Sequence, residues 1–215
     1  MATEHVVQQG EHLSQISAKY GFLNYRTVWD HPQNADLKAL RKTPNVLLPG
    51  DSIHIPDKLQ KQESRATGQL HRFQVPSQRL FLHLVLKDWA NQPLTDTDCV
   101  LQLEGKAIAL KTDSNGRIKM PISITEAEAT LTFKDPMVPF DLVVPIKIGH
   151  LDPVDSASGQ MARLSNLGYI TRPLEDVDDT VMARTVQEFQ CDAGLPVTGE
   201  CDAATQSKLK EMHGS

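Results

Sequence analysis

The sequence predicts a multidomain α+β protein that combines a strand–helix–helix–strand unit, an antiparallel β-sandwich and a three-helix bundle. The spacing of apolar residues changes twice along the 215 residues, from mixed to alternating and then to helical. Aromatic residues make up only 5% of the chain, which suits several small cores better than one large core. Polar segments separate the three regions that differ in apolar spacing. We therefore expect units at 1–57, 79–148 and 158–215, with linkers at 58–78 and 149–157.

The first unit, 1–57, combines short helical and extended patterns. Apolar residues after Gly10 follow helical spacing as far as Gly21, where a left-handed helix end costs least. Pro32 should interrupt the next helical stretch, and Asn34 can cap its continuation. The stretch "LLPGDSIHIP" then supplies a turn and a second strand. Two helices against one face of a two-stranded sheet would complete this unit.

The second unit, 79–148, alternates apolar and polar residues, as strands with one buried face do. Leucines occupy every second position from Leu80 to Leu86, and "CVLQLEG" repeats the alternation. The tight-turn sequence "TDSNG" separates two further strand-like stretches. Six or more short strands of this kind predict an antiparallel sandwich. Trp89 lies in a hairpin loop, where it can be an exposed contact or can cap the sandwich.

The third unit, 158–215, is helical throughout. Its apolar residues follow helical spacing in three segments, the first two of which end at Gly168 and Gly194. Asp179 and Asp202 stand at positions where helix N-caps are expected. The three helices can pack as a compact bundle.

The charge balance argues against nucleic acid and membrane partners. Lys and Arg total 22 against 27 for Asp and Glu, a formal net charge of -5, whereas phosphate-rich partners require a basic surface. No apolar run approaches the roughly 20 residues that span a bilayer. The start "MATEHVVQQG" lacks the features of a secretory signal peptide. We therefore expect a protein that is cytoplasmic as synthesised.

The cysteines Cys99, Cys191 and Cys201 indicate neither a disulfide framework nor a zinc site, since their number is odd and no CxxC pair occurs. We expect unpaired thiols, and a bridge between Cys191 and Cys201 stays open for an oxidising compartment. No two histidines share the close helical spacing of a zinc-binding pair. The sequence predicts no metal and no cofactor.

The sequence also lacks recognisable catalytic constellations. HExxH, GxSxG, GxxxxGK[ST] and GxGxxG are all absent. The acidic cluster Asp176, Asp178 and Asp179 resembles a pair of catalytic carboxylates, but no second acid is placed across a cleft from it. We expect this cluster to be a solvated loop with one helix cap, and we expect the protein not to be an enzyme.

Residues 5–57 resemble a LysM domain, through "VVQQGEHLSQISAKYG" at the opening and "VLLPGDSIHIP" at the closing strand. This resemblance implies binding of glycans that contain N-acetylglucosamine, with backbone amides and apolar side chains holding an N-acetyl group. The same two segments can also serve only to close the fold. The glycan-binding residues that the resemblance implies lie in two facing loops: Gly10, Glu11, His12 and Leu13, and Asn45, Val46, Leu47 and Leu48.

Residues 158–214 resemble the three-helix peptidoglycan-binding domain found beside many cell-wall hydrolases, through "RLSNLGY", "ARTVQEFQ" and "AGLPVTGECDAATQSKL". The resemblance points to Tyr169, Gln187 and Gln190 as groove residues that bind peptidoglycan, although Tyr169 also suits a packing role at a helix end. Residues 79–148 resemble transthyretin-like or carboxypeptidase-regulatory sandwiches, a likeness that concerns the fold alone.

The combination of modules resembles proteins that accompany bacterial type VI secretion spikes and effectors. This resemblance rests on "DHPQNADLKALRKTPNVLLPGDSIHIPD" and "GHLDPVDSASGQMARLSNLGY". It implies a non-catalytic protein that binds peptidoglycan, through its glycan or its stem peptide, with a spike or effector protein as a further partner. Delivery to the periplasm by the secretion apparatus would follow synthesis in the cytoplasm. The alternative is an adaptor or chaperone-like protein of the same apparatus that uses wall-binding folds for protein contacts.

Overall fold

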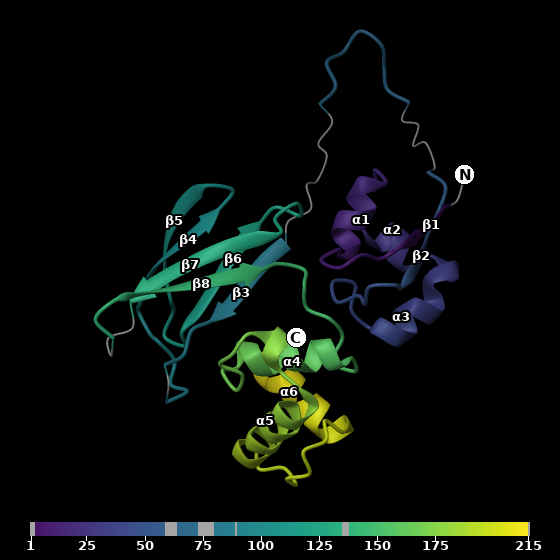
Figure 1. Ribbon diagram of the computed structural model, residues 1–215. Coiled ribbons are helices and arrows are strands. Elements are labelled where there is room, and N and C mark those ends of the chain that lie inside the picture. Colours follow the sequence, from purple (N-terminus) through teal and green to yellow (C-terminus); the bar gives the residue numbers. More distant parts are fainter. Residues whose placement is uncertain (1–2, 59–63, 73–79, 89, 135–137, 215) are drawn as a thin grey trace.

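The computed structural model describes residues 3–58, 64–72, 80–88, 90–134 and 138–214. Helices and antiparallel strands form an amino-terminal unit, a central β unit and a carboxy-terminal helical unit along the chain (Figure 1). The predicted mixed α+β fold with a helical carboxy-terminal region is therefore confirmed. Within the described residues no helix is both long and apolar enough to cross a membrane.

The amino-terminal unit pairs its first and last strands around a set of short helices. Its elements are β1 (Thr3–Val6), α1 (Leu13–Lys19), α2 (Arg26–Trp29), the 3-10 turn η1 (Pro32–Asn34), α3 (Ala35–Arg41) and β2 (Ser52–Ile55). β1 and β2 are antiparallel, with Thr3 opposite Ile55. Their core includes Leu13, Ile16 and Ile53, all completely buried. Pro32 interrupts the helical stretch as predicted, because its ring cannot continue the preceding helix.

Asn34 stands before α3 but does not cap it, contrary to the expectation from sequence. Its side-chain amide donates to the carbonyls of Val28 and His54, both at 2.8 Å, and its oxygen accepts the backbone N–H of His54 at 2.8 Å. The side chain is buried, so its polar atoms satisfy a strand and a helix end in place of a helix start. Asn34 thereby fastens the helices to β2.

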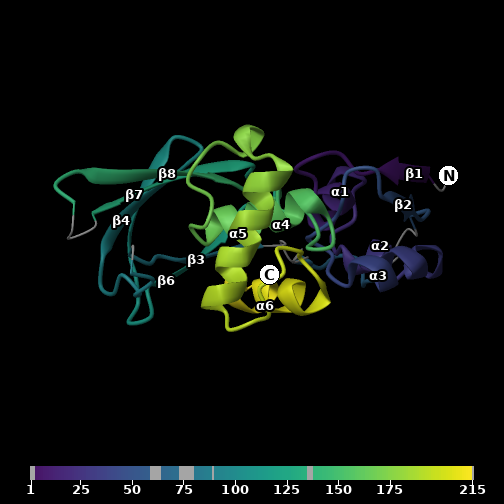
Figure 2. The same ribbon diagram turned by 60° about the horizontal axis from the view of Figure 1, so that its bottom comes forward.

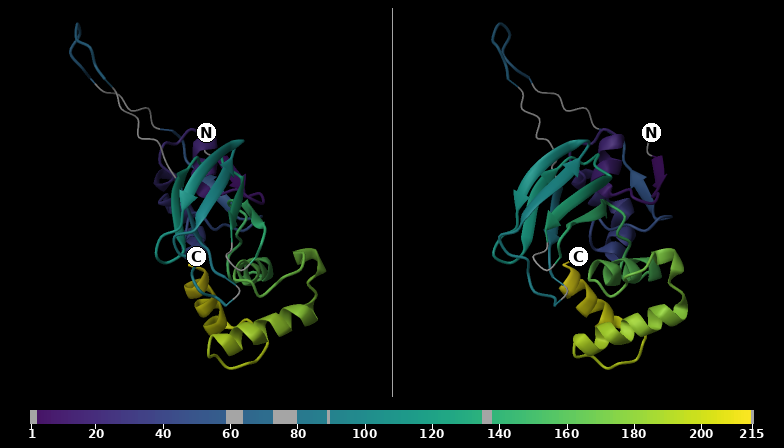
Figure 3. Two further views of the ribbon diagram at one scale, coloured as in Figure 1. Left: turned by 90° about the vertical axis from the view of Figure 1, so that its left-hand side faces the viewer. Right: turned by 60° about the vertical axis from the view of Figure 1, so that its left-hand side comes forward.

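The central β unit contains two antiparallel sheets that share one core. β3 (Leu80–Val85) pairs with β6 (Arg117–Ile122), and the second sheet has the order β5 (Lys106–Lys111), β4 (Asp98–Leu103), β7 (Glu128–Lys134), β8 (Asp141–Lys147). Alternation along β4 and β6 sends every second side chain into that core, including Leu101, Leu103 and Ile118. Figure 3 shows both sheets from the side. Trp89 lies outside the described residues.

The helical unit consists of α4 (Ala157–Asn166), the 3-10 turn η2 (Leu174–Asp176), α5 (Asp179–Asp192) and α6 (Ala203–His213). Leu164, Val186, Phe189 and Leu209 form its buried core. Asp202 caps α6 as predicted, because its carboxylate accepts the backbone N–H of Thr205 at 2.8 Å.

The sequence suggested Asp179 as the cap of α5, but the cap is Asp178. Asp178 has extended backbone angles and accepts the backbone N–H of Val181 at 2.8 Å, whereas Asp179 is already the first residue of the helix. One member of the acidic cluster is thus a helix cap, and all three of its aspartates are exposed.

Residues 149–157, expected as a linker, pack against the units on either side. Asp152, Pro153 and Val154 are buried. Asp152 accepts a hydrogen bond from Ser158 Oγ at 2.6 Å and a longer one from Gln9 Nε2 at 3.4 Å. Figure 2 shows α4, which follows this segment, between the central β unit and the amino-terminal unit. We call residues 149–157 the connecting segment.

A buried arginine on one side and an ion pair of Arg41 on the other hold the connecting segment against its neighbouring units. Arg163 of α4 is completely buried, and its Nη1 donates to the carbonyls of Asp152 and Gly159 at 2.8 and 2.7 Å. On the other side, Arg41 Nη1 lies 3.6 Å from the carboxylate of Asp155. The connecting segment therefore contacts the amino-terminal unit through Gln9 and Arg41 and the helical unit through Arg163.

Candidate functional site

Gln190, predicted as a groove residue, is a buried hydrogen-bond centre of the helical unit. Its side chain is 1% exposed and projects from α5 into the loop between α5 and α6. Its Nε2 donates to Thr198 Oγ1, the Glu200 carbonyl and Thr205 Oγ1 at 3.1, 2.9 and 3.0 Å. Its Oε1 accepts the backbone N–H groups of Thr198 and Gly199 at 2.8 and 3.0 Å. Gln190 thus shapes the loop from inside and has no surface to offer a ligand.

Gln187 lies one helical turn before Gln190 and is exposed. A β-carbon on Gly199 would lie 3.2 Å from Gln187 Nε2, so this side chain follows the surface of the same loop. Gly199 has φ of +81°, a conformation that favours glycine. The structure therefore brings Gln187 and Gln190 together at residues 198–200, one on the surface and one beneath it.

Tyr169 follows the end of α4 and packs against a different part of α5. Its ring packs edge-on against Phe189, with centroids 5.5 Å apart, and its hydroxyl donates to the carboxylate of Asp192 at 3.1 Å. Burial, followed by the nearby Asp192 charge, raises the pKa of Tyr169 to about 12. The phenol is half-buried, so its ring packs in the core while its polar edge reaches the surface. Tyr169 can contact a ligand only with that edge.

The raised pKa of Tyr169 gives a spectroscopic prediction. Absorbance titration should show one of the three tyrosines ionising near pH 12, above the usual value of about 10. Tyr169→Phe should remove this late step, and Asp192→Asn should move it to lower pH because the neighbouring negative charge is gone. Because folding raises this pKa, the stabilisation is complete below about pH 10 and is lost between about pH 10 and 12. A titration in which Tyr169→Phe removes no step near pH 12 would contradict the burial of Tyr169.

The predicted amino-terminal site residues lie in two loops that meet beside α1. The backbone N–H of Leu13 donates to the Pro44 carbonyl at 3.2 Å, which joins the Gly10 turn to the loop before β2. Leu13 and Leu47 are 0% and 4% exposed and belong to the core, so their side chains face inward. Asn45 is exposed, while Val46 and Leu48 are half-buried. Asn45 is therefore the member of the second loop that reaches solvent most readily.

Glu11 and His12 make contacts within the amino-terminal unit. Glu11 Oε2 accepts the backbone N–H of Gln8 at 2.9 Å and lies 2.8 Å from His5 Nε2, and Lys19 Nζ lies 3.4 Å from Oε1. Burial of the carboxylate opposes its ionisation, but the Gln8 and His5 hydrogen bonds prevail and lower the pKa of Glu11.

His12 is buried at the N-cap of α1, where Nδ1 accepts the backbone N–H of Gln15 at 3.3 Å. Burial lowers the pKa of His12, so the ring stays neutral and Nδ1 can accept this hydrogen bond. Sequence reasoning did not assign His12 this role, because histidine is not among the preferred N-cap residues.

The Gly10 turn faces the connecting segment. A β-carbon on Gly10 would lie 2.8 Å from His150 Nε2, and one on Gly149 would lie 2.6 Å from the Gly10 carbonyl oxygen. Both glycines have positive φ, +87° and +81°, so the two backbones approach where no side chain intervenes. One side of the Gly10 turn is therefore covered by the chain itself.

Chemically reactive groups are few in the part of the chain that the structure describes. Cys99, Cys191 and Cys201 are free thiols there, and burial raises the pKa of Cys201 to about 11, which keeps that thiol protonated at neutral pH. The described residues contain no cluster of three or more histidine, cysteine, aspartate or glutamate side chains that could hold a metal ion.

Comparison with known proteins finds a similarity in the helical unit. A family model described as a putative peptidoglycan binding domain matches residues 161–209, which run from α4 into α6 and include Tyr169, Gln187 and Gln190. No curated protein and no solved structure matches the chain. The predicted peptidoglycan-binding character of the carboxy-terminal region is confirmed at the level of the family, and it points to a role in binding the cell wall.

Proposed function

We propose that this chain is a non-catalytic peptidoglycan-binding protein whose helical unit attaches it to the cell wall. The observation that carries the proposal is the family match over residues 161–209. The fold of that stretch supports it, since α5 and α6 have their caps and Gln190 holds the loop between them. The exposed side chain of Gln187 and the polar edge of Tyr169 are the surface groups that we assign to wall binding.

We further assign the amino-terminal unit to the LysM fold, with glycan contacts at the loop that carries Asn45 and Val46. The order of elements from β1 to β2, with helices between two antiparallel strands, supports this assignment. The central β unit, with its two antiparallel sheets and shared core, is assigned to the transthyretin-like sandwiches, in the role of a spacer.

The setting that we propose is a type VI secretion apparatus, with a spike or effector protein as a further partner. Support comes from the sequence resemblance of residues 30–57 and 149–169 to proteins of such systems. In this setting the protein is made in the cytoplasm and is delivered to the periplasm by the apparatus. The net charge of -5 fits partners other than nucleic acid or anionic lipid.

Sedimentation with purified peptidoglycan sacculi tests the wall-binding proposal. The full chain should pellet with sacculi, and Gln187→Ala combined with Tyr169→Phe should reduce the bound fraction severalfold, because the two changes remove the Gln187 amide and the Tyr169 hydroxyl from the surface and leave the Tyr169 ring in the core. Incubation should release no soluble muropeptides, with or without added zinc. A chain that stays in the supernatant would overturn wall binding, and a digestion product would overturn the non-catalytic assignment.

The alternative function, an adaptor that uses these folds for protein contacts, is favoured by one observation. The Gly10 turn already packs against a peptide segment, since Gly149 and His150 of the connecting segment approach it closely. A turn that packs against a segment of its own chain in this way can pack against a partner's segment. Failure to sediment with sacculi, together with a stable complex with a purified secretion spike protein, would favour the adaptor.

A further inference from the structure

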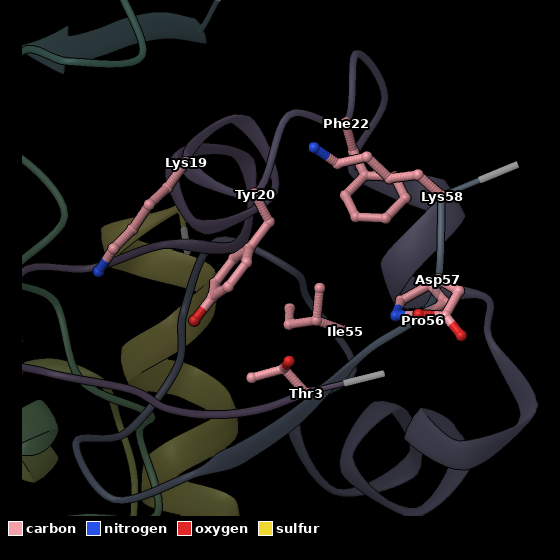
Figure 4. Close-up of a pocket in the computed structure, with 8 residues that line it drawn as sticks. All are labelled: Thr3, Lys19, Tyr20, Phe22, Ile55, Pro56, Asp57 and Lys58. Carbon is pink, nitrogen blue, oxygen red and sulfur yellow. The ribbon is translucent and has the colours of Figure 1, made fainter. Parts of the chain in front are cut away.

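The amino-terminal unit has an open cleft at the end of α1 remote from the Gly10 turn. The cleft has a volume of about 560 Å³ and lies where β1, β2 and the residues after α1 meet. Figure 4 shows its eight lining residues, Thr3, Lys19, Tyr20, Phe22, Ile55, Pro56, Asp57 and Lys58. Its volume falls in the range of small-ligand sites, roughly 300–1,000 Å³. None of the loop residues assigned to glycan contacts lines it.

The floor of this cleft is apolar and held in place. Ile55 is 4% exposed and belongs to the core of the unit. The Tyr20 ring is fixed by its hydroxyl, which lies 3.1 Å from His5 Nδ1, and by edge-on packing on the His5 ring. Phe22 packs against the same core. Two half-buried rings beside a buried isoleucine offer contact for small apolar groups.

Two lysines stand at the edges of the apolar floor. Figure 4 shows Lys19 beside Tyr20 and Lys58 beside Phe22, with their ammonium groups well apart. The Lys58 side chain lies over Gly21. A β-carbon at Gly21 would lie 2.5 Å from Lys58 Nζ, so the absence of one leaves room for the lysine along the rim of the cleft. Lys19 is 58% exposed and lies 3.4 Å from the Glu11 carboxylate, so its charge is partly shared. Among the described residues Lys58 has no such carboxylate within ion-pair distance, and we take it as the stronger anchor for an anion, with the Asp57 carboxylate also lining the cleft.

We propose that this cleft binds a short acidic peptide, in which carboxylates pair with Lys58 and Lys19 while small apolar side chains lie on Tyr20, Phe22 and Ile55. The inference rests on the proposed function, because the stem peptides of peptidoglycan combine carboxylates with the methyl side chains of alanine. Charge-assisted hydrogen bonds to ammonium groups supply the selectivity for carboxylates. The amino-terminal unit would then contact the peptide part of the wall through a surface separate from its glycan loops.

Nuclear magnetic resonance with the full chain and a defined peptide tests this site. The probe is acetyl-Ala-Glu-Ala-Ala with a free carboxyl terminus, and the control is acetyl-Ala-Gln-Ala-Ala amide, which has the same size and no carboxylate. The acidic peptide should shift the backbone amides of Gly21, Phe22 and Ile55 in a saturable manner. The neutral peptide should shift them at least about fivefold less at equal concentration in low salt.

Matched lysine variants separate the two cations from general charge effects. Lys58→Gln should raise the dissociation constant about fivefold to tenfold, and Lys19→Gln should raise it less because Glu11 already shares that charge. Lys106→Gln, an exposed lysine of β5 in the central unit, is the control and should leave binding unchanged. All three lysines are exposed, so the thermal unfolding of the variants should match that of the parent chain.

The outcomes that overturn the proposal are distinct from those that affect wall binding. Equal shifts with the neutral peptide, or unchanged affinity in Lys58→Gln and Lys19→Gln, would overturn the acidic-peptide site. Retention on sacculi without any peptide-induced shift would overturn this site and leave the proposed function standing. Peptide binding without retention on sacculi would support the site and overturn the proposed function.

Discussion

Gln190→Leu is expected to unfold the helical unit and to remove binding to peptidoglycan sacculi. The substitution removes the Nε2 group, whose two hydrogens serve three acceptors, and the Oε1 atom, which accepts two hydrogen bonds, in a position that is 1% exposed. The backbone N–H groups of Thr198 and Gly199 lose their acceptor, and the Thr205 hydroxyl, which also bonds to Asp202, loses one of its partners. Each unsatisfied buried group costs about 1–3 kcal/mol, so the total loss should reach roughly 3–5 kcal/mol. A loss of this size is a large part of the stability of a small domain.

Thermal unfolding and hydrogen exchange would measure this effect, with Gln187→Leu as the matched control. Gln187 is on the same helix and has the same side chain but is exposed, so its replacement should change stability by less than about 0.5 kcal/mol. Amides of residues 198–205 should exchange rapidly in Gln190→Leu and remain protected in Gln187→Leu. A stable, wall-binding Gln190→Leu protein would show that the loop between α5 and α6 does not depend on this side chain.

Arg41→Met is expected to destabilise the amino-terminal unit by about 3–5 kcal/mol, because it leaves a buried carboxylate without its partner. Arg41 and Asp51 are each 8% exposed, and Nε and Nη2 of Arg41 donate to the two carboxylate oxygens of Asp51, both at 2.8 Å. The hydrogen bond to Asp51 raises the pKa of Arg41, against the opposing effect of burial. Asp51 also accepts the backbone N–H of Leu48 at 2.9 Å. The pair therefore holds α3, the loop before β2 and β2 itself.

Chemical denaturation would measure the Arg41 effect, with Lys38→Met as its control. Lys38 is on the same helix and pairs with Asp30 at 2.6 Å, but its side chain is 48% exposed, so this ion pair should contribute at most about 1 kcal/mol. The double variant Arg41→Met with Asp51→Asn should recover part of the lost stability, since no buried charge then remains unpaired. Equal effects of Arg41→Met and Lys38→Met would show that burial of the Arg41 pair contributes nothing.

Sequence patterns predicted the elements of this protein better than the roles of single polar residues. Alternation in "CVLQLEG" and helical spacing around Phe189 are strong signals, because burial of one face sets the period of each element. Pro32 and Gly21 marked helix boundaries through backbone geometry alone. Such features depend only on neighbouring residues, and the sequence displays them directly.

Polar side chains were harder to place, because their partners are remote in sequence. Gln190 was assigned to a groove, but its hydrogen bonds with residues 198–205 make it a buried support. Asn34 was assigned to a helix cap, but its amide bonds to the backbone of β2. Asp178 and Asp179 are adjacent, and only the backbone angles decide which one caps α5. The cleft beside Tyr20 leaves no sequence signal, since its walls come from the two ends of the unit.

The contacts of the connecting segment affect how strongly the amino-terminal and helical units can bind together to one polymer. Gln9 and Arg41 meet Asp152 and Asp155, so the amino-terminal and helical units are held near each other although more than a hundred residues separate Arg41 from Asp152. With a flexible tether, the effective concentration of a second binding event falls as the linker lengthens. Here the spacing between the two units is set by packing and not by the length of the intervening chain. A polymer with repeating binding sites at a matching interval would then engage both units with little loss of conformational entropy.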